Sequence, residues 1–500
     1  MNANVDVAET LALVKAAYHQ PEDMNKAWNQ ASSAISGITA YDLEAPAKMV
    51  FPVLTPLRNQ IPRVSGRGGI QANWRAVWGI NTTSVPLGVT QGNRGGVMTT
   101  ITADHLAAYK GLGLEDFVTF EANYSAEGFQ DVKSLAALDL LHAVMIGEEQ
   151  VILGGNSSLA LGTTATPTVV GSATGGSLTG TTSVIVVALT MAAYQRATVA
   201  GGIPQQISRA SSGPYANTDT INGGAARKSA AASASTGAGA GSATATVTAL
   251  KGAYAYAWYW GTGGSEALGA ITTINSVSIL ANATGTQLAS ALAAADYSQD
   301  STVFDGLLTL CNATPPTNAA AGYYSAQATG TAGTGTPLTS GSDGTITEID
   351  TALQWFWDNY RLSPDLMLVS SQEMKNIRKK ALTGSTTSAQ RFIFDTNQQG
   401  MIIGTGVRAY SNPFTMAGNQ EIEIQLHPNM PAGTVLFLTR KLPYPLSNVQ
   451  NVMQIRTRQE YYQLEWPVIT RKYEYGVYTD EVLQHFFPPS LGMITNVGNG

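Results

Sequence analysis

The stretch from Ser125 to Leu153, SAEGFQDVKSLAALDLLHAVMIGEEQVIL, carries the strongest helical pattern in this chain of 500 residues. Ser125 can cap the helix, Glu127 suits its positive N-terminal end, and Gly154-Gly155 stops it. Its apolar residues recur at helical spacing and form one widened stripe: Phe129, Val132, Leu135, Ala136, Leu138, Leu140, Leu141, Val144, Met145 and Val151. At about 1.5 Å per residue, the sequence predicts a helix of roughly 40 Å, the backbone of a flat or elongated domain.

Upstream of this helix the pattern changes to strands. Residues 66–113 alternate like a hairpin, with glycine-rich turns at GRGG (66–69) and GNRGG (92–96). The recurring prolines of APAKMVFPVLTPLRNQIPRVSG (45–66) disfavour regular helix and predict an extended strap before the hairpin. A two-stranded loop has too little core to be stable alone, so we expect it to dock on another surface.

The strap and hairpin are basic in a chain whose net charge is −6. Between residues 50 and 113 there are six basic side chains and one acidic one, Asp104. An acidic surface of a neighbouring copy would fit this charge better than nucleic acid would. The residues expected to contact other subunits are Arg58, Arg63, Arg67, Trp74, Arg75, Trp78, Arg94 and Lys110.

The middle of the chain is poor in charge. Residues 155–345 carry 11 of the 62 charged side chains and are rich in Gly, Ala, Ser and Thr. Rings alternate with small residues in Tyr254-Ala-Tyr-Ala-Trp-Tyr-Trp260, which predicts a strand with its rings in a core. The alternative for these rings is a platform that stacks sugars or bases. We expect a β-sandwich over about 165–282, inserted into a host domain, with the tract at 229–242 as a flexible loop.

Helices and strands mix again after the insert. Thr345-x-x-Glu348 predicts a capping box for a helix that runs to about Tyr360. Leu366 to Val369 reads as a buried strand and Gln372 to Ala381 as a helix. The tail at 449–482 alternates heavily and predicts long strands.

No sequence motif favours an enzyme. There is no phosphate-binding loop, G-x-S-x-G elbow or H-E-x-x-H pair, and the five histidines have no ligand spacing. The single cysteine, Cys311, excludes cysteine-based zinc sites and is expected to be a buried structural thiol. Glu148-Glu149 are assigned to a solvated helix face rather than to acid–base chemistry. We expect no catalytic residue, cofactor, metal or membrane span.

Taken together, the flanks of the insert resemble the major capsid protein of tailed bacteriophages, with its Hong Kong 97-like fold. PLRNQIPRVSGRGG (56–69) is similar to the arm that enters the extended loop, and 66–113 to the loop itself. Ser125 to Leu153 resembles the spine helix of the peripheral domain. The segments similar to the axial domain and to the returning strands are FDGLL (304–308), GTITEIDTALQWFW (344–357), SPDLMLVSSQEMKNI (363–377) and YYQLEWPVITRKYEYGVYTDEV (461–482). The insert resembles the immunoglobulin-like domains that some capsid proteins carry.

The resemblance implies an α+β fold with six parts. These are an N-terminal arm (1–65), an extended loop (66–115), a peripheral domain with the spine helix (116–154), an inserted β-sandwich (155–300), an axial domain (301–445) and returning peripheral strands (446–500). It also implies self-assembly into hexamers and pentamers of an icosahedral phage head enclosing double-stranded DNA. The shell would form in the host cytoplasm, with portal, scaffolding and decoration proteins as further partners of the virion.

Two other functions stay open at this point. The first is a virion surface protein that uses the β insert to adhere to a host or a carbohydrate. The second is an encapsulin-type nanocompartment shell built on the same fold.

Overall fold

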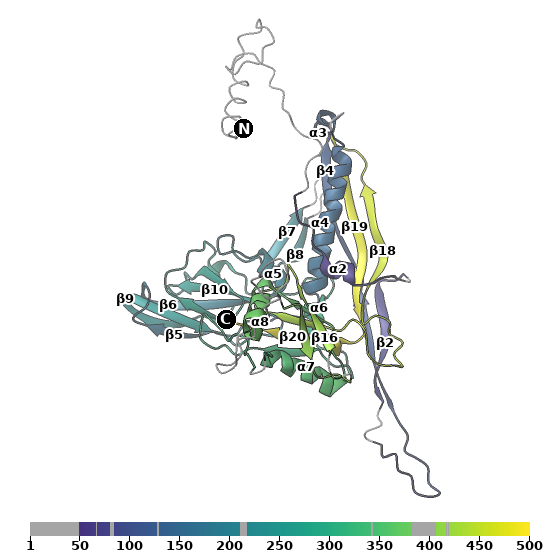
Figure 1. The fold of residues 1–500 in the computed structure, drawn as a ribbon. Helices are drawn as coiled ribbons and strands as arrows, with labels where there is room; N and C mark the ends of the chain where they lie inside the picture. The colour runs from purple at the N-terminus through teal and green to yellow at the C-terminus, as the bar shows by residue number, and fades with distance from the viewer. Residues whose placement is uncertain are drawn as a thin grey trace, which may run out of the picture. The chain divides into compact units, whose positions relative to one another are not determined.

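The computed structural model describes residues 50–500 except 67, 81–84, 128–129, 211–217, 342–343, 383–406, 417 and 419. The chain forms two compact units, residues 1–52 with 121–132 and residues 53–120 with 133–500. Helices and strands are mixed along the chain, so the expected α+β class is confirmed (Figure 1). Most of the expected N-terminal arm, residues 1–49, lies outside the described residues.

The long helix begins later than predicted. A short helix, α3 (Phe120–Ser125), comes first, and its Ser125 hydroxyl donates to the Glu121 carbonyl at 2.7 Å. Ser125 therefore ends one helix instead of capping the next. The long helix α4 (Val132–Gly154) follows with 23 residues and buries Leu140, Val144, Ile152 and Leu153. Gly128 falls in the sequence between the two helices, and glycine carries a helix penalty of about 1 kcal/mol.

A four-stranded sheet lies along α4 in the larger unit. Its order is β1 (Arg63–Ser65), β18 (Met453–Glu465), β19 (Lys472–His485) and β4 (Lys110–Thr119). The Lys133 ammonium lies over the Tyr473 ring near one end of α4. Near the other end, Glu148 of α4 and Glu481 of β19 both form an ion pair with Arg63. The helix and β19 therefore run side by side, as Figure 1 shows.

A six-stranded sheet forms the second part of the larger unit. Its order is β13 (Tyr323–Ala326), β20 (Gly492–Thr495), β17 (Val435–Leu438), β14 (Leu366–Val369), β16 (Gln420–Leu426) and β15 (Ala409–Asn412). One face packs on α7 (Thr347–Tyr360) and the other on the C-terminal end of α4. Since both faces are covered, β14 and β17 are apolar at every position, which is why Leu366 to Val369 could be predicted as a buried strand.

The capping box predicted for α7 is wrong. Ile346 occupies the N-cap position without a side-chain cap, and Glu348 instead accepts the Thr339 N–H at 2.9 Å. The C-terminal end is capped by Arg361, which has a left-handed backbone (φ 53°) and donates its Nη1 to the carbonyl of Trp357 at 2.6 Å. Helix α8 (Ser371–Leu382) then follows β14, close to its expected range.

The inserted segment is built from strands, as predicted. One sheet pairs β11 (Ala267–Thr272), β10 (Ala255–Gly261) and β6 (Leu178–Leu189), and β9 (Ala232–Thr246) continues from it to pair with β5 (Thr168–Ser172) and β12 (Ser276–Ile279). Tyr256, Trp258 and Trp260 are buried on one face, and Ala255, Ala257 and Tyr259 on the other. The core position of this aromatic run is therefore confirmed. Nothing in the strand order establishes the immunoglobulin-like resemblance.

The expected flexible loop at 229–242 is wrong, because most of this tract belongs to β9. Ala alternates with Ser or Thr along much of the strand, which is the period of a β-strand even though the side chains are small. Its glycines fit close contacts of the backbone: a Cβ at Gly241 would collide with the Thr236 carbonyl oxygen. Composition suggested flexibility, whereas pairing with β6 along the tract and with β5 and β12 just beyond it fixes the strand.

Short elements join these parts, and their bounds complete the fold. They are α2 (Pro56–Gln60), β2 (Gln71–Ile80), β3 (Thr100–Ala108), α5 (Met191–Arg196), β7 (Gln206–Ala210), β8 (Thr218–Asn222), η1 (Ala289–Ala291), α6 (Leu307–Asn312) and η2 (Pro488–Ser490). The expected domain boundaries stay predictions. The strands after residue 445 divide between the two sheets, since β18 and β19 join β1 and β4 whereas β20 joins β13 and β17.

Candidate assembly surface and the ion cluster at its base

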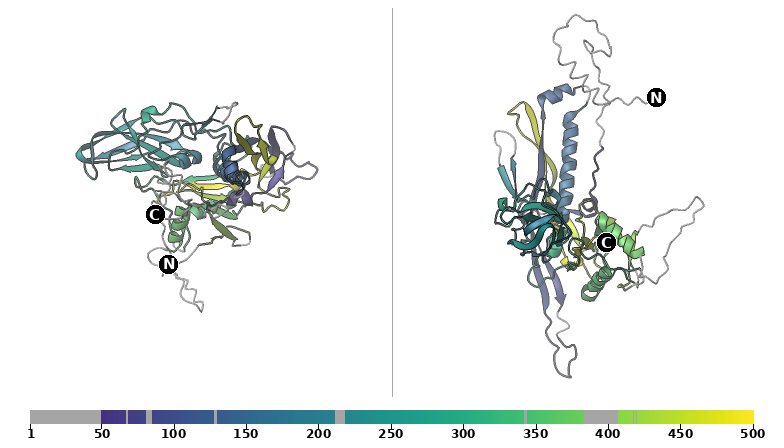
Figure 2. Two further views of the ribbon diagram at one scale, coloured as in Figure 1. Left: turned by 90° about the horizontal axis from the view of Figure 1, so that it is seen from above. Right: turned by 90° about the vertical axis from the view of Figure 1, so that its left-hand side faces the viewer.

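Strands β2 and β3 form a two-stranded hairpin, as the alternation predicted. They pair antiparallel from Gln71–Ala108 to Ile80–Thr100, and no third strand described here joins them. Figures 1 and 2 show the hairpin projecting from the remainder of the larger unit. Its outer part therefore has no core of its own.

The base of the hairpin is anchored by aromatic contacts. The Trp74 ring stacks on His105 with 5.4 Å between ring centroids, and the Trp78 ring stacks on Phe487 at 5.1 Å. His105 and the neighbouring His485 are buried, and burial lowers the pKa of both imidazoles, that of His485 to about 3. The neutral imidazoles pack among the neighbouring aromatic rings. These contacts hold the base of the hairpin against the rest of the subunit.

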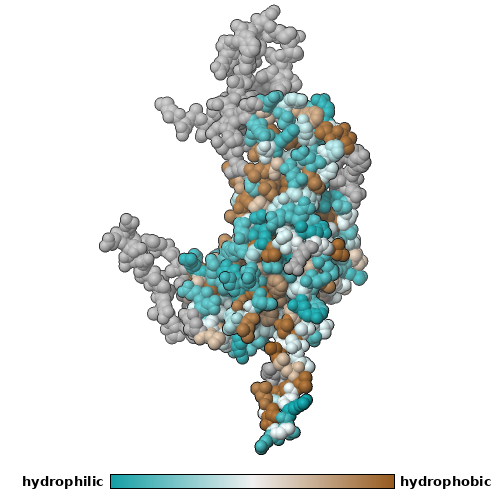
Figure 3. Space-filling model, turned by 90° about the vertical axis from the view of Figure 1, so that its right-hand side faces the viewer, coloured by the Kyte–Doolittle hydropathy of each residue, from teal (hydrophilic) through white to brown (hydrophobic). Residues whose placement is uncertain are grey.

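The outer part of the hairpin exposes apolar side chains. Leu87 and Val97 are 86% and 88% exposed. The other exposed apolar residues of the outer hairpin are Val77, Ile80, Val89, Met98 and Ile101. Figure 3 shows the apolar surface of this projection in brown. A group of this kind on one projecting element is typical of a surface that another protein covers.

The predicted contact residues of the hairpin differ in where they lie and what they contact. Trp74 and Trp78 lie at the anchored base, so they are used inside the chain. Arg94 is exposed near the tip, and Arg67 lies outside the described residues. The exposed Arg75 forms an ion pair with Asp104, whose pKa is lowered by this hydrogen bond. His105, the next residue, instead packs against the Trp74 and Trp78 rings.

Lys110 lies at the first residue of β4, where its Nζ donates to the Ser301 carbonyl at 2.6 Å. This bond joins β4 to the segment that follows the insert. Contacts of Arg75, Arg94 and Lys110 with another subunit stay predictions.

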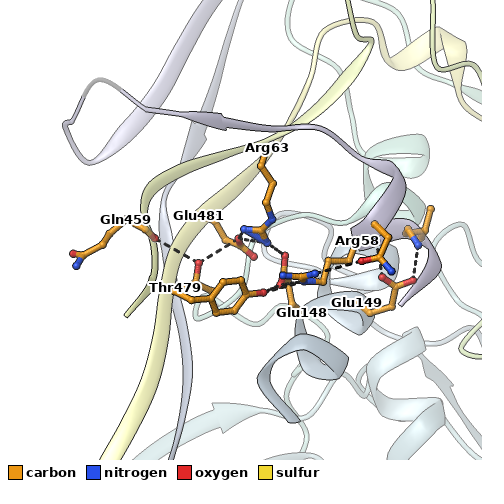
Figure 4. Close-up of polar contacts among 10 residues, drawn as sticks. Arg58, Arg63, Glu148, Glu149, Gln459, Thr479 and Glu481 are labelled. Carbon is orange, nitrogen blue, oxygen red and sulfur yellow. Dashed lines mark hydrogen bonds and ion pairs between the residues drawn. The ribbon is translucent and has the colours of Figure 1, made fainter. Parts of the chain in front are cut away.

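Arg58 and Arg63 are used within the chain, in a buried ion cluster (Figure 4). Both belong to residues 53–65, here called the strap, which contains α2 and β1. Arg58 Nε lies 3.0 Å from Glu148 Oε2, and Arg63 Nη2 forms an ion pair with Glu148 Oε1. Arg63 Nη1 and Nη2 each lie 3.1 Å from Glu481 Oε2. The Tyr461 hydroxyl also donates to Glu148.

The Glu149 side chain binds backbone N–H groups of the strap. Its two carboxylate oxygens accept the Leu57 N–H at 2.9 Å and the Arg58 N–H at 2.7 Å, at the start of α2. His427 Nε2 lies 2.7 Å from Glu149 Oε1, while its Nδ1 accepts the Asn429 N–H at 3.2 Å. That acceptor role places the proton of a neutral ring on Nε2, which donates to Glu149.

We refer to Glu148, Glu149 and Glu481 as the carboxyl cluster. All three side chains have 0% exposure. Burial and the neighbouring Glu148 carboxylate raise the pKa of Glu481 to about 8, against an opposing effect of Arg63. One of its oxygens, Oε1, has no hydrogen-bond partner among the described residues.

The expected solvated face for Glu148 and Glu149 is therefore wrong. The stripe of α4 that meets the strap includes both carboxylates, and two arginines and two backbone N–H groups of the strap bind them. Sequence reasoning also missed Tyr461, His427 and Glu481. The sequence did contain one signal, the excess of basic residues around Arg58 and Arg63. Basic residues that are buried require acidic partners.

Other kinds of site leave no trace in the described part of the chain. Within residues 50–500, apart from the gaps given above, no three His, Cys, Asp or Glu side chains are grouped to hold a metal ion. No helix in that part is long and apolar enough to cross a membrane. Cys311 is fully buried, and burial raises the pKa of its thiol to about 12, which confirms a structural thiol.

Comparison with known proteins gave matches in structure alone. No family model and no curated protein matches the sequence. The capsid of a native GTA particle matches with 8% identity, covering 92% of this chain and 96% of that chain, with a TM-score of 0.43. The capsid of the Myoviridae phage XM1 matches with 9% identity over 90% and 95% of the two chains (TM-score 0.39). The capsid of the cyanophage P-SCSP1u matches with 8% identity over 93% and 94% (TM-score 0.38). Each of these three solved structures is described as a capsid.

Proposed function

We propose that this chain is a major capsid protein, the structural subunit of an icosahedral phage head. Copies assemble in the host cytoplasm into hexamers and pentamers, with scaffolding, portal and decoration proteins as further partners of the virion. The shell encloses double-stranded DNA without reading its sequence. The net charge of −6 agrees with a wall that does not hold DNA tightly.

The observation that carries this proposal is the outer half of the β2–β3 hairpin. It exposes Leu87 and Val97 almost fully, and its described residues from 85 to 100 belong to none of the buried core clusters. Covering such side chains stabilises a complex by about 25 cal/mol for each Å² of apolar surface removed from water. A second copy of the chain is the partner that a shell supplies at every position.

The adhesive function is not favoured by any feature of the insert. Its aromatic run, the feature that suggested ligand stacking, is buried, and Trp258 and Tyr259 have no exposed surface. Their polar atoms are also used: Trp258 Nε1 donates to Thr272 at 2.8 Å and the Tyr259 hydroxyl to Gln287 at 2.7 Å. These rings hold the insert together.

A shortened hairpin tests the proposal. Residues 80–100 are deleted and Gly79 is joined to Ile101 through Asn-Gly, a dipeptide that favours a tight turn. The anchored base, with Trp74 and Trp78, is kept. We expect a folded subunit that forms no closed particles by negative-stain electron microscopy and sedimentation, while the unaltered chain forms them. Normal shells from the shortened chain would refute the role of the hairpin.

A further inference from the structure

The strap is attached to the subunit through ionisable groups and through two buried apolar side chains, Leu57 and Ile61. Its N-terminal part is held by Glu149 at the Leu57 and Arg58 N–H groups, and its C-terminal part by Arg63. Backbone pairing is short, because β1 contributes three residue pairs with β18. The bond from Gly66 N to the Thr457 carbonyl, at 2.6 Å, continues this pairing by one position.

The other side of the strap borders empty space. A cavity of about 410 Å³ lies between the strap and the six-stranded sheet, lined by Leu57 and Ile61 of the strap and by Leu366 and Leu438 of the sheet. Close packing is therefore incomplete on this side, although Leu57 and Ile61 are themselves buried.

The carboxyl groups around the strap have fewer cations at ion-pair distance than there are carboxyl groups. The ionisable groups that meet here are Arg58 and Arg63 from the strap, Glu148 and Glu149 from α4, Tyr461 from β18, Glu481 from β19, His427 after β16, and Lys110 opposite Glu481 in β4. Lys110 is bonded to the Ser301 carbonyl, and His427 acts as a neutral donor. At ion-pair distance, the described residues thus place two arginines against three carboxyl groups, while the charge of Lys110 is directed to the Ser301 carbonyl, so one added proton favours this buried set.

We propose that the strap is a proton-controlled latch, closed on α4 and β19 while Glu481 holds a proton beside the Glu148 carboxyl group and opened more readily once Glu481 is ionised. Arg63 bridges the two carboxyl groups and is the part of the latch that belongs to the strap. This device lies within one chain, so it does not depend on the proposed assembly function.

The direction of the pH effect follows from the burial of Glu481. In the closed state its pKa is about 8, and in an open, solvated state it returns towards the ordinary 4.5. Between these two pH values, opening releases the proton. The opening constant therefore rises by up to about tenfold for each pH unit and levels off above pH 8. The opening constant is lowest below about pH 4.5.

Hydrogen–deuterium exchange of the full chain tests the latch. The exchange of a peptide covering residues 53–66 is followed from pH 5.5 to 9 and divided by the intrinsic rate at each pH. We expect the protection of this peptide to fall by at least tenfold up to pH 8 and then to stay level. The buried strand β17 (Val435–Leu438) serves as the internal reference and should keep its protection.

Three variants separate the latch from general loosening. Glu481→Gln keeps the cluster neutral at every pH, so its strap should stay protected throughout. Glu148→Gln should behave alike, because one carboxyl then faces Arg63 without a charged neighbour. Arg63→Met should lose at least tenfold in protection even at pH 5.5. The exposed Glu460 of β18 gives the matched control, Glu460→Gln, which should retain the pH dependence of the unaltered chain.

Two results would overturn the proposal. One is a strap whose protection in the unaltered chain does not change between pH 5.5 and 9. The other is a pH-dependent loss of the same size in Glu481→Gln and in Glu148→Gln. The pH series on the unaltered chain decides the matter even where a variant does not fold.

Discussion

Asn275 and Asn496 are 221 positions apart in the sequence and hydrogen bond to each other twice. The Asn275 N–H donates to Asn496 Oδ1 at 2.8 Å, and Asn496 Nδ2 donates to Asn275 Oδ1 at 3.0 Å. Asn275 Nδ2 also donates to the Val247 carbonyl and to Thr329, at 2.6 and 2.8 Å. This buried network joins the insert to the end of β20, so the insert is fixed to the six-stranded sheet.

Substitution Asn275→Ala should destabilise the subunit by about 2 kcal/mol, because the Val247 carbonyl and one Asn496 amide group lose their buried partner. Urea unfolding measures the change. The exposed Asn359, which donates to the Trp355 carbonyl in α7, gives the control Asn359→Ala with an expected change of about 0.5 kcal/mol or less. Equal effects of the two substitutions on the free energy of unfolding would show that the buried network stabilises the subunit no more than an exposed hydrogen bond does.

Excision of residues 165–282 should unfold the subunit instead of leaving a shell without an accessory domain. Tyr254 from this segment belongs to the core shared with α4 and α6, donates to the Leu308 carbonyl at 3.2 Å and accepts from Asn312 at 2.9 Å. Circular dichroism of the shortened chain checks this expectation. A cooperative thermal transition like that of the full chain would contradict it.

His485 should make stability depend on pH in the acidic range. Its folded pKa of about 3 lies below the ordinary 6.5, so the unfolded chain binds a proton that the folded chain excludes. Stability therefore falls as the pH drops from 6.5 towards 3, by up to about 1.4 kcal/mol per pH unit. Neither ring nitrogen of His485 has a partner among the described residues. The free energy of unfolding differs between pH 7 and pH 5, and His485→Leu should remove about 2 kcal/mol of that difference.

Urea unfolding at pH 5, 6 and 7 measures how His485 changes the free energy of unfolding with pH. If the unaltered chain and His485→Leu lose stability equally between pH 7 and pH 5, other groups dominate acid unfolding. A large loss for His485→Leu at pH 7 itself would point to a packing role for the ring.

Charge on the outer hairpin should block assembly without unfolding the subunit. The double substitution Leu87→Glu and Val97→Glu replaces exposed side chains, so we expect a change of about 0.5 kcal/mol or less in the free energy of unfolding. Sedimentation should show no particles. Leu446, 99% exposed on another loop, gives the control Leu446→Glu, which should assemble normally.

Periodicity predicted the parts of the fold whose burial is local and regular. Leu366 to Val369 is apolar throughout because both faces are covered, and the rings from Tyr254 to Trp260 alternate because the two faces of β10 differ. In both cases a few neighbouring residues carry the whole signal. The hairpin is of the same kind, since its pairing joins segments close in sequence.

The carboxyl cluster could not be predicted in this way. Glu148 and its partner Arg63 are 85 positions apart, and Glu149 binds the strap through backbone N–H groups that leave no mark on the sequence. A glutamate pair near a helix end is ordinarily solvated, and only the tertiary position of the strap reverses this. The same holds for β9, whose small side chains suggested a loop until two neighbouring strands fixed it.

The position of β20 gives the folding of this subunit a fixed order in time. Residues 492–495 lie between β13 and β17, and the ribosome makes them after every other strand of the six-stranded sheet. Until they emerge, β13 lacks its neighbour and β17 keeps an open edge. The sheet therefore closes only after residue 495 has been made, and a chain that stops before it lacks the strand that joins β13 to β17.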